Sequence, residues 1–331
     1  MSRVSLAEWQ KFIQKYPDAH VLQTAEWGEL KAAFGWDVVR LIQADQGIQI
    51  LFRKLPLGFT AAYAPKPCLN PHANFAGDQF WAEVDQVCRQ KRAIFLKIEL
   101  DAWEHETIHL GSARRVFKPS PHNIQPPRTI VISLDGSLDD ILARMKQKCR
   151  YNIRLAEKKD IAIRAWDDLD GFHQLMQVTG GRDGFGVHSQ TYYRKAYDLF
   201  HQAGMAELFV AEFENKPLAA LMIFAHGQRS WYLYGASNDQ ERNRMPTYLL
   251  QWEAMKWARE HGCMMYDLWG VPDADETTLE AQFEDRHDGL WGVYRFKRGF
   301  GGQLMRAAQA QDRVYMPLLY RLYLRRMGKD E

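Results

Sequence analysis

Residues 208–234 read LFVAEFENKPLAALMIFAHGQRSWYLY and contain three strand-like runs in close succession. The runs cover residues 208–213, 218–225 and 231–234, and the turn ENKP at residues 214–217 joins the first two. Short runs of apolar, aromatic and β-branched residues that are separated by turn residues predict consecutive strands. We therefore expect an antiparallel meander of three strands at this place in the chain.

Helical patterns lie on both sides of this meander. Residues 169–179 and 191–202 precede it, and a longer helical pattern follows it. The later helix has an apolar face with spacing i, i+4, i+7 and i+8, formed by Leu250, Ala254, Trp257 and Ala258. It ends at His261-Gly262, a last-turn cation and a C′ glycine, and leads to a strand at residues 264–268.

The same order of elements occurs in the first half of the chain. Two helical patterns are followed by three strand-like runs, a helix and a further strand, at residues 6–16, 25–34, 38–43, 48–52, 60–63, 79–90 and 94–98. Helices, a meander, a helix and another strand are the order of an acetyltransferase-like (GNAT) domain. The sequence therefore predicts an α+β fold of two tandem GNAT-like domains. A chance likeness of two unrelated α/β halves is the alternative.

A proline-rich tract at residues 118–128 marks the expected boundary between the domains. Domain 1 then comprises residues 1–127, and domain 2 comprises residues 128–304. A strand-like piece and a helix follow, at residues 304–309 and 317–327. We expect the C-terminal residues 305–331 to pack back on domain 1.

Composition restricts the class of protein. Of 331 residues, 46% are hydrophobic and 25% are charged, the balance of a folded globular protein. The four cysteines stand far apart without a C-x-x-C pair, which favours buried thiols in a reducing cytosol over disulfides or a zinc site. The sequence shows no signal peptide pattern, and no run approaches the ~18 apolar residues of a membrane helix. We expect a cytoplasmic protein that binds no metal.

A lysine followed by glycines stands in residues 296–302 (FKRGFGG), close behind residues 266–270 (YDLWG). Glycines permit positive φ or a close approach of the backbone to a ligand. A lysine held in that setting can present its charge to a phosphate or to a developing oxyanion. Lys297 is therefore a candidate catalytic residue. A glycine turn with a lysine stem lying on aromatic rings is the alternative.

A GNAT-like fold makes acetyl-CoA the first ligand to consider. Enzymes that use CoA hold its pyrophosphate on a glycine-rich turn at the start of the helix after the meander. The corresponding places here, residues 241–247 (ERNRMPT) and 75–78 (FAGD), lack the glycine pattern. We therefore expect no CoA cofactor, and an acyl group that arrives on another carrier.

A basic segment indicates which carrier. Residues 144–159 read RMKQKCRYNIRLAEKK, with seven Lys or Arg against the single acidic residue Glu157. Arg150, Arg154 and Lys158 have i, i+4, i+8 spacing and therefore share one helix face. Such a stripe fits nucleic-acid phosphates and gives affinity without sequence reading. We predict that these three residues bind tRNA and that DNA is not a partner; a solvated helix face is the alternative.

Several short motifs, taken in order, resemble one family. They are QTAEW (23–27) with Lys31 and Trp36, KIE (97–99), KxRYNIRLA (148–156), WYLYG (231–235), YDLWG (266–270) and FKxGFGG (296–302). Together they resemble the Fem-type aminoacyl-tRNA-dependent peptidyltransferases, which build peptidoglycan cross-bridges. The resemblance spans nearly the whole chain. It implies two GNAT-like domains and, since sustained heptads are absent, the form without a coiled-coil arm.

The resemblance also implies roles for single residues. Lys31 would contact phosphates or sugar of the precursor, and Glu99 would orient the acceptor amine or take up its proton. Glu99 departs from the family pattern, which has an Asp-Pro pair where this chain has Glu99-Leu100. The remaining substrate-binding residues would be His188, Tyr192, Tyr234 and Phe296. Because the family has a phosphate-binding arginine where His188 stands, Arg182 is an alternative phosphate contact.

The expected reaction is transfer of an amino acid from aminoacyl-tRNA to a side-chain amine of a peptidoglycan precursor. The precursor is nucleotide-linked or lipid-linked, and a lipid-linked one would bring peripheral membrane contact. The acceptor amine would attack the ester carbonyl directly while the Lys297 ammonium stabilises the developing negative charge. Three alternatives stay open: a tRNA-dependent protein N-terminal aminoacyltransferase, a GNAT acyltransferase with a degenerate CoA loop, and a non-catalytic RNA-binding pair of domains.

Overall fold

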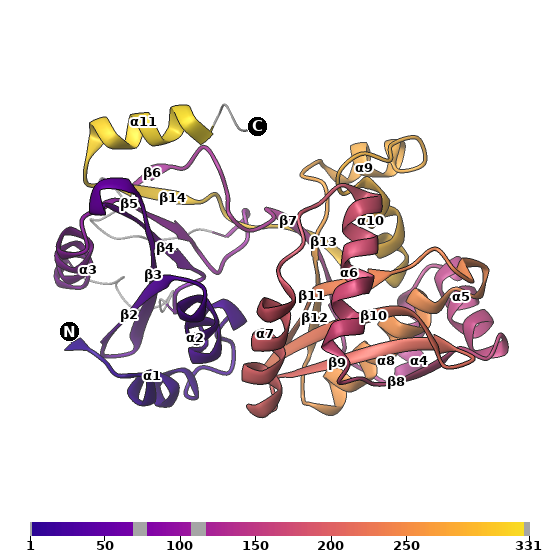
Figure 1. Ribbon diagram of the computed structural model, residues 1–331. Helices are drawn as coiled ribbons and strands as arrows, with labels where there is room; N and C mark the ends of the chain where they lie inside the picture. The colour runs from indigo at the N-terminus through magenta and orange to yellow at the C-terminus, as the bar shows by residue number, and fades with distance from the viewer. Residues whose placement is uncertain (1, 69–77, 107–116, 328–331) are drawn as a thin grey trace. The chain divides into compact units, whose positions relative to one another are not determined.

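A computed structural model describes residues 2–68, 78–106 and 117–327, and it has a mixed α+β fold (Figure 1). The chain divides into two compact units. Unit 1 comprises residues 1–127 and 307–331, and unit 2 comprises residues 128–306. Each unit has its own seven-stranded sheet.

Unit 1 is built on the first of these sheets. Its elements are β1 (Ser2–Arg3), α1 (Leu6–Ile13), α2 (Ala25–Ala33), β2 (Trp36–Gln43), β3 (Gln46–Lys54), the 3₁₀ turn η2 (Pro56–Gly58), β4 (Thr60–Pro65), α3 (Asp78–Gln90), β5 (Ala93–Glu99), β6 (Phe117–Pro119), β14 (Gln311–Val314) and α11 (Pro317–Met327). The strand order is β1-β2-β3-β4-β5-β14-β6.

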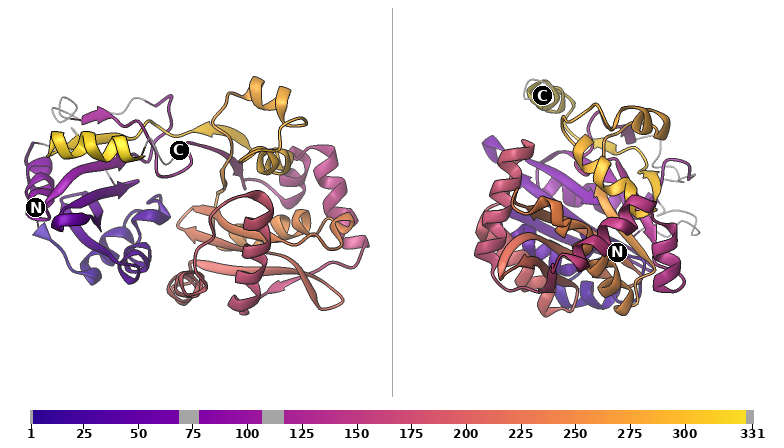
Figure 2. Two further views of the ribbon diagram at one scale, coloured as in Figure 1. Left: turned by 45° about the horizontal axis from the view of Figure 1, so that its top comes forward. Right: turned by 90° about the vertical axis from the view of Figure 1, so that its right-hand side faces the viewer.

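Helices cover both faces of the first sheet. Leu96 and Ile98 of β5 belong to a buried cluster that contains Phe80 and Trp81 of α3. Phe95, next to Leu96 in sequence, packs against the rings of α11, at 5.2 Å from Tyr320 and 4.9 Å from Tyr323. Successive side chains of a strand point to opposite faces. α3 and α11 therefore lie on opposite faces of β5, and Figure 2 shows α11 in yellow along this sheet.

Unit 2 repeats the pattern with more elements. They are β7 (Arg128–Ser133), α4 (Leu138–Arg144), α5 (Gln147–Lys158), β8 (Ala162–Ala165), α6 (Leu169–Asp183), α7 (Gln190–Gln202), β9 (Ala206–Phe213), β10 (Lys216–His226), β11 (Arg229–Ser237), η4 (Arg242–Arg244), α8 (Pro246–Glu260), β12 (Met265–Gly270), α9 (Glu276–Gln282), α10 (Trp291–Lys297), η5 (Arg298–Phe300) and β13 (Gln303–Arg306). The strand order is β13-β7-β12-β11-β10-β9-β8.

The meander predicted from residues 208–234 is present as β9, β10 and β11, paired antiparallel. Along β10, Leu221 and Ile223 belong to a buried cluster with α5 and α8 residues. Phe224 instead contacts Phe200 of α7, with ring centroids 5.0 Å apart. The alternation of apolar side chains on this strand thus supplies two core faces, one under α8 and one under α7.

The duplication predicted from the sequence extends to the pairing of strands. In both units the third meander strand pairs parallel with the strand after the following helix, β4 with β5 and β11 with β12. The predicted α+β fold with two GNAT-like halves is confirmed. In the described part of the chain the longest helices, α6 and α8, have 15 residues each, too short for a coiled-coil arm.

The C-terminal prediction needs one correction. The strand expected at residues 304–309 is the short β13, which ends at Arg306, and a second short strand in the other sheet, β14, begins at Gln311. β13 pairs with β7 in unit 2, and β14 pairs with β5 and β6 in unit 1. The helix expected at residues 317–327 is α11. In the described residues, no helix combines the length and the apolar character that a bilayer span requires.

Candidate active site

The strands β11 and β12 separate partway along their length. They pair parallel through Arg229↔Met265, Ser230↔Tyr266 and Trp231↔Asp267, but β11 continues to Ser237 and β12 to Gly270. In unit 1, by contrast, β4 and β5 stay paired from Thr60↔Ala93 to Pro65↔Glu99. The free edges of β11 and β12 beyond their last pair leave backbone groups available for another partner.

Lys297 supplies that partner at the end of α10. Its side chain is buried, and Nζ donates hydrogen bonds to the carbonyl oxygens of Gly270 at 2.9 Å and Trp269 at 3.3 Å. Nζ also lies 5.5 Å from the ring centroid of Tyr232 on β11. The lysine therefore lies where β11 and β12 separate. Because an ammonium has three N–H donors, these two hydrogen bonds leave one donor for a substrate.

Burial controls the charge of this lysine. Loss of hydration lowers the pKa of Lys297 to about 7, and the nearby Asp267 carboxylate partly opposes the shift. Burial also raises the pKa of Asp267 above its usual value. A lysine whose pKa lies near neutrality exchanges its proton readily at physiological pH, which suits proton transfer as well as charge stabilisation.

Asp267 and Trp269 hold the end of β12 in an unusual shape. Trp269 has φ of 62°, a left-handed conformation that is rare for a large side chain. Asp267 Oδ1 accepts from the Trp269 N–H at 2.7 Å and from Thr129 Oγ1, and Thr129 Oγ1 also lies 3.0 Å from the Trp269 carbonyl. These contacts fix the strained residue whose carbonyl receives Lys297, as expected where local strain is maintained at a functional site.

The glycines after Lys297 provide the positive φ that is one of their two predicted uses, and they pack closely against the protein's own backbone. Gly301 has φ of 80°, and a Cβ at this position would collide with the Arg144 carbonyl. Gly302 packs in the same way on Ile130 and Val131 of β7. The Lys146 N–H donates to the Gly299 carbonyl at 2.9 Å. The glycine run therefore lets the α4–α5 connection and β7 pack directly behind Lys297.

Phe296 contacts different residues from those that contact Lys297. Its ring lies 5.1 Å from Tyr248 of α8 and 5.1 Å from Phe300. Tyr248 in turn hydrogen-bonds with Asn152 of α5. These contacts make Phe296 part of the packing that joins α10, α8 and α5, and its substrate-binding role stays a prediction.

Three of the predicted substrate-binding residues meet in unit 2. His188 stacks on Tyr192 with ring centroids 4.0 Å apart, and the hydroxyls of Tyr192 and Tyr234 are 3.3 Å apart. Tyr192 is buried, Tyr234 is half-buried and His188 is exposed. Burial and the neighbouring tyrosines hold the pKa of Tyr234 well above its usual value, so its hydroxyl stays protonated. Arg182 is instead bound to Asp183 and Asp239.

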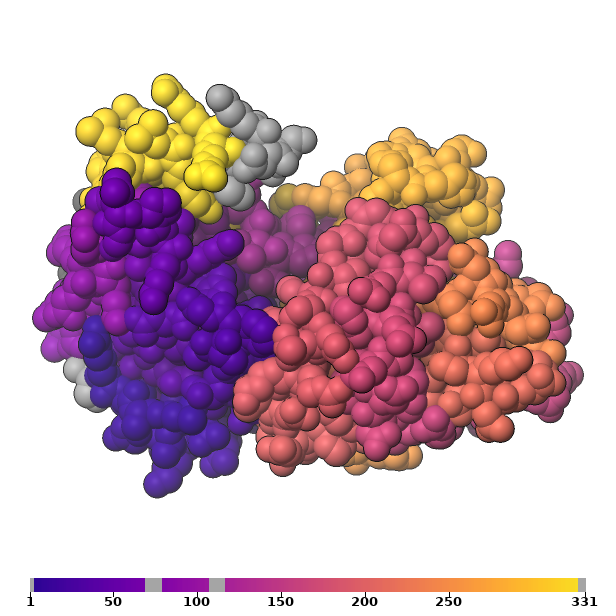
Figure 3. Space-filling model, viewed as in Figure 1, coloured from indigo at the N-terminus to yellow at the C-terminus, as the bar shows by residue number. Residues whose placement is uncertain are grey.

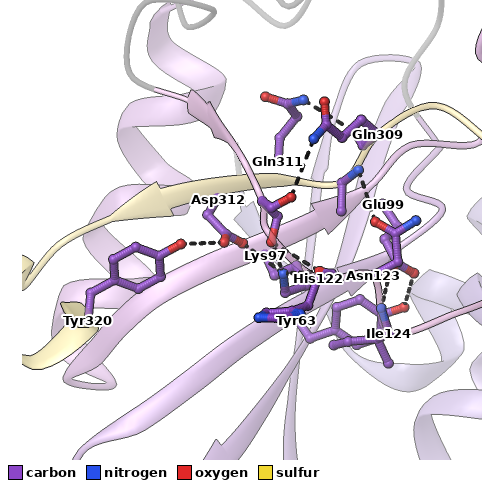
Figure 4. A network of polar contacts seen from close by, with 12 residues as sticks. Tyr63, Lys97, Glu99, His122, Asn123, Ile124, Gln309, Gln311, Asp312 and Tyr320 are labelled. Carbon is purple, nitrogen blue, oxygen red and sulfur yellow. Dashed lines mark hydrogen bonds and ion pairs between the residues drawn. The ribbon is translucent and has the colours of Figure 1, made fainter. Parts of the chain in front are cut away.

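Lys31 and Glu99 both lie in unit 1. The Lys31 ammonium lies 4.3 Å from the ring centroid of Trp27, one turn earlier on α2. Glu99 is buried at the end of β5, where Oε2 accepts from the Tyr63 hydroxyl at 2.5 Å. Its Oε1 accepts from the backbone N–H groups of Ile124 and Gln125 (Figure 4). Glu99 thereby ties part of the proline-rich tract to unit 1, and its catalytic role stays a prediction.

The basic segment forms α5, but its three predicted tRNA-binding residues differ in environment. Arg154 and Lys158 are exposed and have no partner within the residues that the structure describes. Arg150 is half-buried, and its guanidinium donates to the carbonyls of Met145 and Ala143 at the end of α4. Arg150 therefore stabilises a helix C-terminus. Of the predicted trio, Arg154 and Lys158 are the residues exposed to a polyanion.

Residues 241–247, where a CoA-using enzyme would have its glycine-rich loop, are filled in unit 2 by their own side chains. Before α8, Glu241 and Met245 both adopt left-handed conformations. Arg244 donates to the Lys159 carbonyl at 2.7 Å and covers the ring of Phe213 at 3.4 Å. Pro246, the first residue of α8, has no N–H to offer a phosphate. The other expected place, residues 75–78, lies almost wholly outside the described residues.

The structure adds three residues that the sequence analysis did not assign to a site. Asp267 and Tyr232 flank Lys297, and they belong to the YDLWG and WYLYG motifs that carry the family resemblance. Tyr151, on the exposed side of α5 beside Arg154, has 61% of its surface accessible. An aromatic residue among cations on one helix face is a usable signal for this third residue.

Comparisons with known proteins agree with this architecture. The FemAB family model matches residues 4–108, 114–216 and 205–324. A lipid II:glycine glycyltransferase of Staphylococcus haemolyticus (strain JCSC1435) is 28% identical over 398 residues, covering 95% of this chain and 93% of the relative. Because that alignment is longer than the 331-residue chain, the relative contains stretches that have no counterpart here.

Two solved structures share the fold. The crystal structure of FemX matches with a TM-score of 0.85 and 24% identity over 97% of this chain and 99% of that chain. A tandem GNAT protein from the clavulanic acid biosynthesis pathway matches with a TM-score of 0.53 and 11% identity, over 94% and 96% of the two chains. Since the family model spans most of the sequence, the resemblance seen in the short motifs is confirmed, and the chain belongs to the FemAB family.

Proposed function

We propose that the protein is an aminoacyltransferase that moves an amino acid from aminoacyl-tRNA to an amine of a peptidoglycan precursor stem peptide. The observation that carries the proposal is the buried Lys297 ammonium, held by the Trp269 and Gly270 carbonyls where β11 and β12 separate. The names of the relatives, lipid II:glycine glycyltransferases, support the class of reaction and a lipid-linked acceptor.

The proposed chemistry is direct attack without a covalent intermediate. The acceptor amine attacks the carbonyl carbon of the aminoacyl ester, the new C–N bond forms, and the bond to the ribose oxygen breaks. Lys297 gives a proton to the departing ribose oxygen, and the proton lost by the amine restores the ammonium. A pKa near 7 suits both transfers. The positive charge also stabilises the oxyanion that develops on the ester carbonyl.

The donor is proposed from two features of unit 2. Arg154 and Lys158 present unpaired cations within the described residues, as a tRNA backbone requires. α5 is fixed to the Lys297 segment through the bond from the Lys146 N–H to the Gly299 carbonyl. A tRNA that lies on α5 is therefore held by an element in contact with the segment that bears Lys297. The side chains that fill residues 241–247 argue against an acetyl-CoA donor.

A donor competition tests the proposal. The full chain is incubated with a lysine-containing muropeptide precursor and either a pool of charged tRNA or labelled acetyl-CoA. We expect a mass increase of one amino-acid residue with the tRNA pool and no acetyl transfer. Acetylation of the precursor, or micromolar CoA binding that adenosine 3′,5′-bisphosphate displaces, would establish the acyltransferase alternative instead.

A further inference from the structure

The two most exposed large hydrophobic side chains of the described residues both lie in unit 1. Leu57 is 85% exposed and Leu318 is 74% exposed, the two highest values of this kind, and Leu322 on the same helix is 59% exposed. Leu57 lies at the tip of the β3–β4 connection, and the other two lie one turn apart on α11. Exposed apolar side chains that gather in one patch are typical of a surface that binds another molecule or a membrane.

These two elements are neighbours at one end of β5. The N–H groups of Tyr315 and Met316, just before α11, donate to the Ile94 carbonyl. The Thr60 N–H, just after the β3–β4 connection, donates to the carbonyl of Arg92, which lies two residues before Ile94 in the sequence. Burial raises the pKa of Tyr323 on α11, and the positive charge of Arg53 at the end of β3 partly opposes this rise. Figures 1 and 3 show the violet β3–β4 turn beside the first turn of the yellow α11.

Basic side chains lie near Leu57, Leu318 and Leu322. The two segments that carry these leucines, residues 46–66 and 313–326, contain no acidic residue. Exposed basic side chains on the two elements and at the start of β5 are Arg53, Lys54, Arg92, Arg321, Arg325 and Arg326. The acidic residues that contact the C-terminal segment, Asp85 and Asp312, are engaged with Arg313 and Lys97. The surface is therefore both apolar and strongly positive.

The backbone conformation of the β3–β4 turn also indicates that Leu57 has a functional role. Leu57 has φ of 61°, so a large side chain adopts a left-handed conformation at the most exposed point of the hairpin. Both the left-handed backbone of Leu57 and the exposure of its side chain are unfavourable, and packing within unit 1 explains neither. Strain of this kind accumulates at functional positions.

We propose that α11 and the β3–β4 turn form a docking surface for an anionic lipid membrane. On α11 the exposed residues Leu318, Arg321, Leu322 and Arg325 have i, i+3, i+4, i+7 spacing, while Tyr320 and Tyr323 pack on Phe95. The helix lies in the interface plane with both leucines in the acyl boundary and the arginines at the headgroups. Leu57 inserts beside them. The proposal concerns docking and does not depend on the reaction proposed above.

Vesicle sedimentation tests the docking surface. The full chain is mixed with vesicles of phosphatidylcholine alone or of phosphatidylcholine with phosphatidylglycerol. We expect binding to the anionic vesicles and much weaker binding to the neutral ones. The double variant Leu318→Ser with Leu322→Ser should bind about tenfold more weakly or worse. Arg321→Gln with Arg325→Gln should lose about fivefold for each arginine. Leu318→Trp should keep binding, because tryptophan is favoured at membrane interfaces.

Matched control variants in unit 2 distinguish binding through this surface from nonspecific binding of the protein to vesicles. Val178→Ser changes a 46% exposed apolar side chain on α6, and Arg154→Gln with Lys158→Gln removes two exposed cations from α5. Both controls should bind anionic vesicles as the wild type does. Unchanged melting temperatures show that the α11 variants are folded.

Three results would overturn the proposal. They are no binding of the wild type to anionic vesicles, equal binding of the wild type and the α11 variants, and loss of vesicle binding in the α5 control. A wild-type dimer that Leu318→Ser dissociates would assign the surface to a second copy of the chain. Weaker tRNA binding by the α11 variants would assign it to nucleic acid.

Discussion

Lys297 is an ionisable side chain in a buried position, so its protonation affects the stability of the folded chain. Its ordinary pKa is 10.5, and burial lowers it to about 7. Between these values the unfolded chain holds a proton that the folded chain has released. Stability contributed by this residue therefore rises with pH across that window and is lowest below pH 7.

The first prediction is a pH-dependent difference between the wild type and Lys297→Met. Methionine fills a similar volume without a charge, so the variant lacks this titration. The free energy of unfolding of the wild type should rise relative to the variant by up to about 1.4 kcal/mol per pH unit above pH 7. Urea unfolding at several pH values measures it. Parallel stability profiles would show that the pKa of Lys297 is not lowered.

The sequence singled out Lys297 but not its surroundings. The structure holds its ammonium on the Trp269 and Gly270 carbonyls, and its catalytic role stays a prediction. The spacing of FKRGFGG identifies an unusual turn, yet it cannot reveal that Arg144 and Ile130 are what the glycines accommodate. Those contacts join residues that are far apart in sequence. Asp267 was missed for the same reason, since its carboxylate acts on Thr129 and Lys297, which lie far from it in the sequence.

The periodic patterns of apolar residues in the sequence located the main helices and strands. The meander strands predicted at residues 208–213, 218–225 and 231–234 are β9, β10 and β11 with longer ends. Short edge strands such as β6 and β8 were not predicted from the sequence. They are held by neighbouring strands and carry too few residues for a period-2 pattern.

The second prediction concerns α5. Changing Arg154 and Lys158 to Gln should weaken tRNA binding and reduce its salt dependence, by roughly 0.7–0.9 in slope for each phosphate that is no longer neutralised. Arg150 is left unchanged because it bonds carbonyls at the end of α4. The matched control, Lys195→Gln with Lys216→Gln, removes two cations from other elements of unit 2. An unchanged salt slope in the α5 variant would favour a solvated helix face.

At the scale of the whole molecule, the chain leaves unit 1 at residue 127 and returns to it at residue 307. The returning strand β14 is fixed by two ion pairs. Lys97 on β5 pairs with the buried Asp312 at 3.2 Å, and the Tyr320 hydroxyl donates to Asp312 at 2.6 Å (Figure 4). The half-buried Arg313 binds Asp85 of α3. A local pattern cannot encode pairing between segments so distant in sequence, so this closure could be expected only in outline.

The third prediction tests that closure. Asp312→Ala leaves the Lys97 ammonium buried without its carboxylate, which should cost about 3–5 kcal/mol of unfolding free energy. Adding Lys97→Met should recover a substantial part of this loss, because the unpaired charge is then removed. Urea unfolding of the full chain compares the two variants. Equal stability of Asp312→Ala and the wild type would mean that the ion pair does not hold β14 to unit 1.

We propose that this FemAB family member transfers an amino acid from tRNA with Lys297 as its catalytic group. The most direct measurement is the rate of labelled amino-acid transfer from charged tRNA to a muropeptide precursor by the wild type and Lys297→Met. We predict a loss of about 10²–10³ in rate, with tRNA and precursor binding within a few fold. A variant that keeps more than half of the activity would contradict the catalytic role of Lys297, and a wild type that transfers nothing would contradict the proposed function.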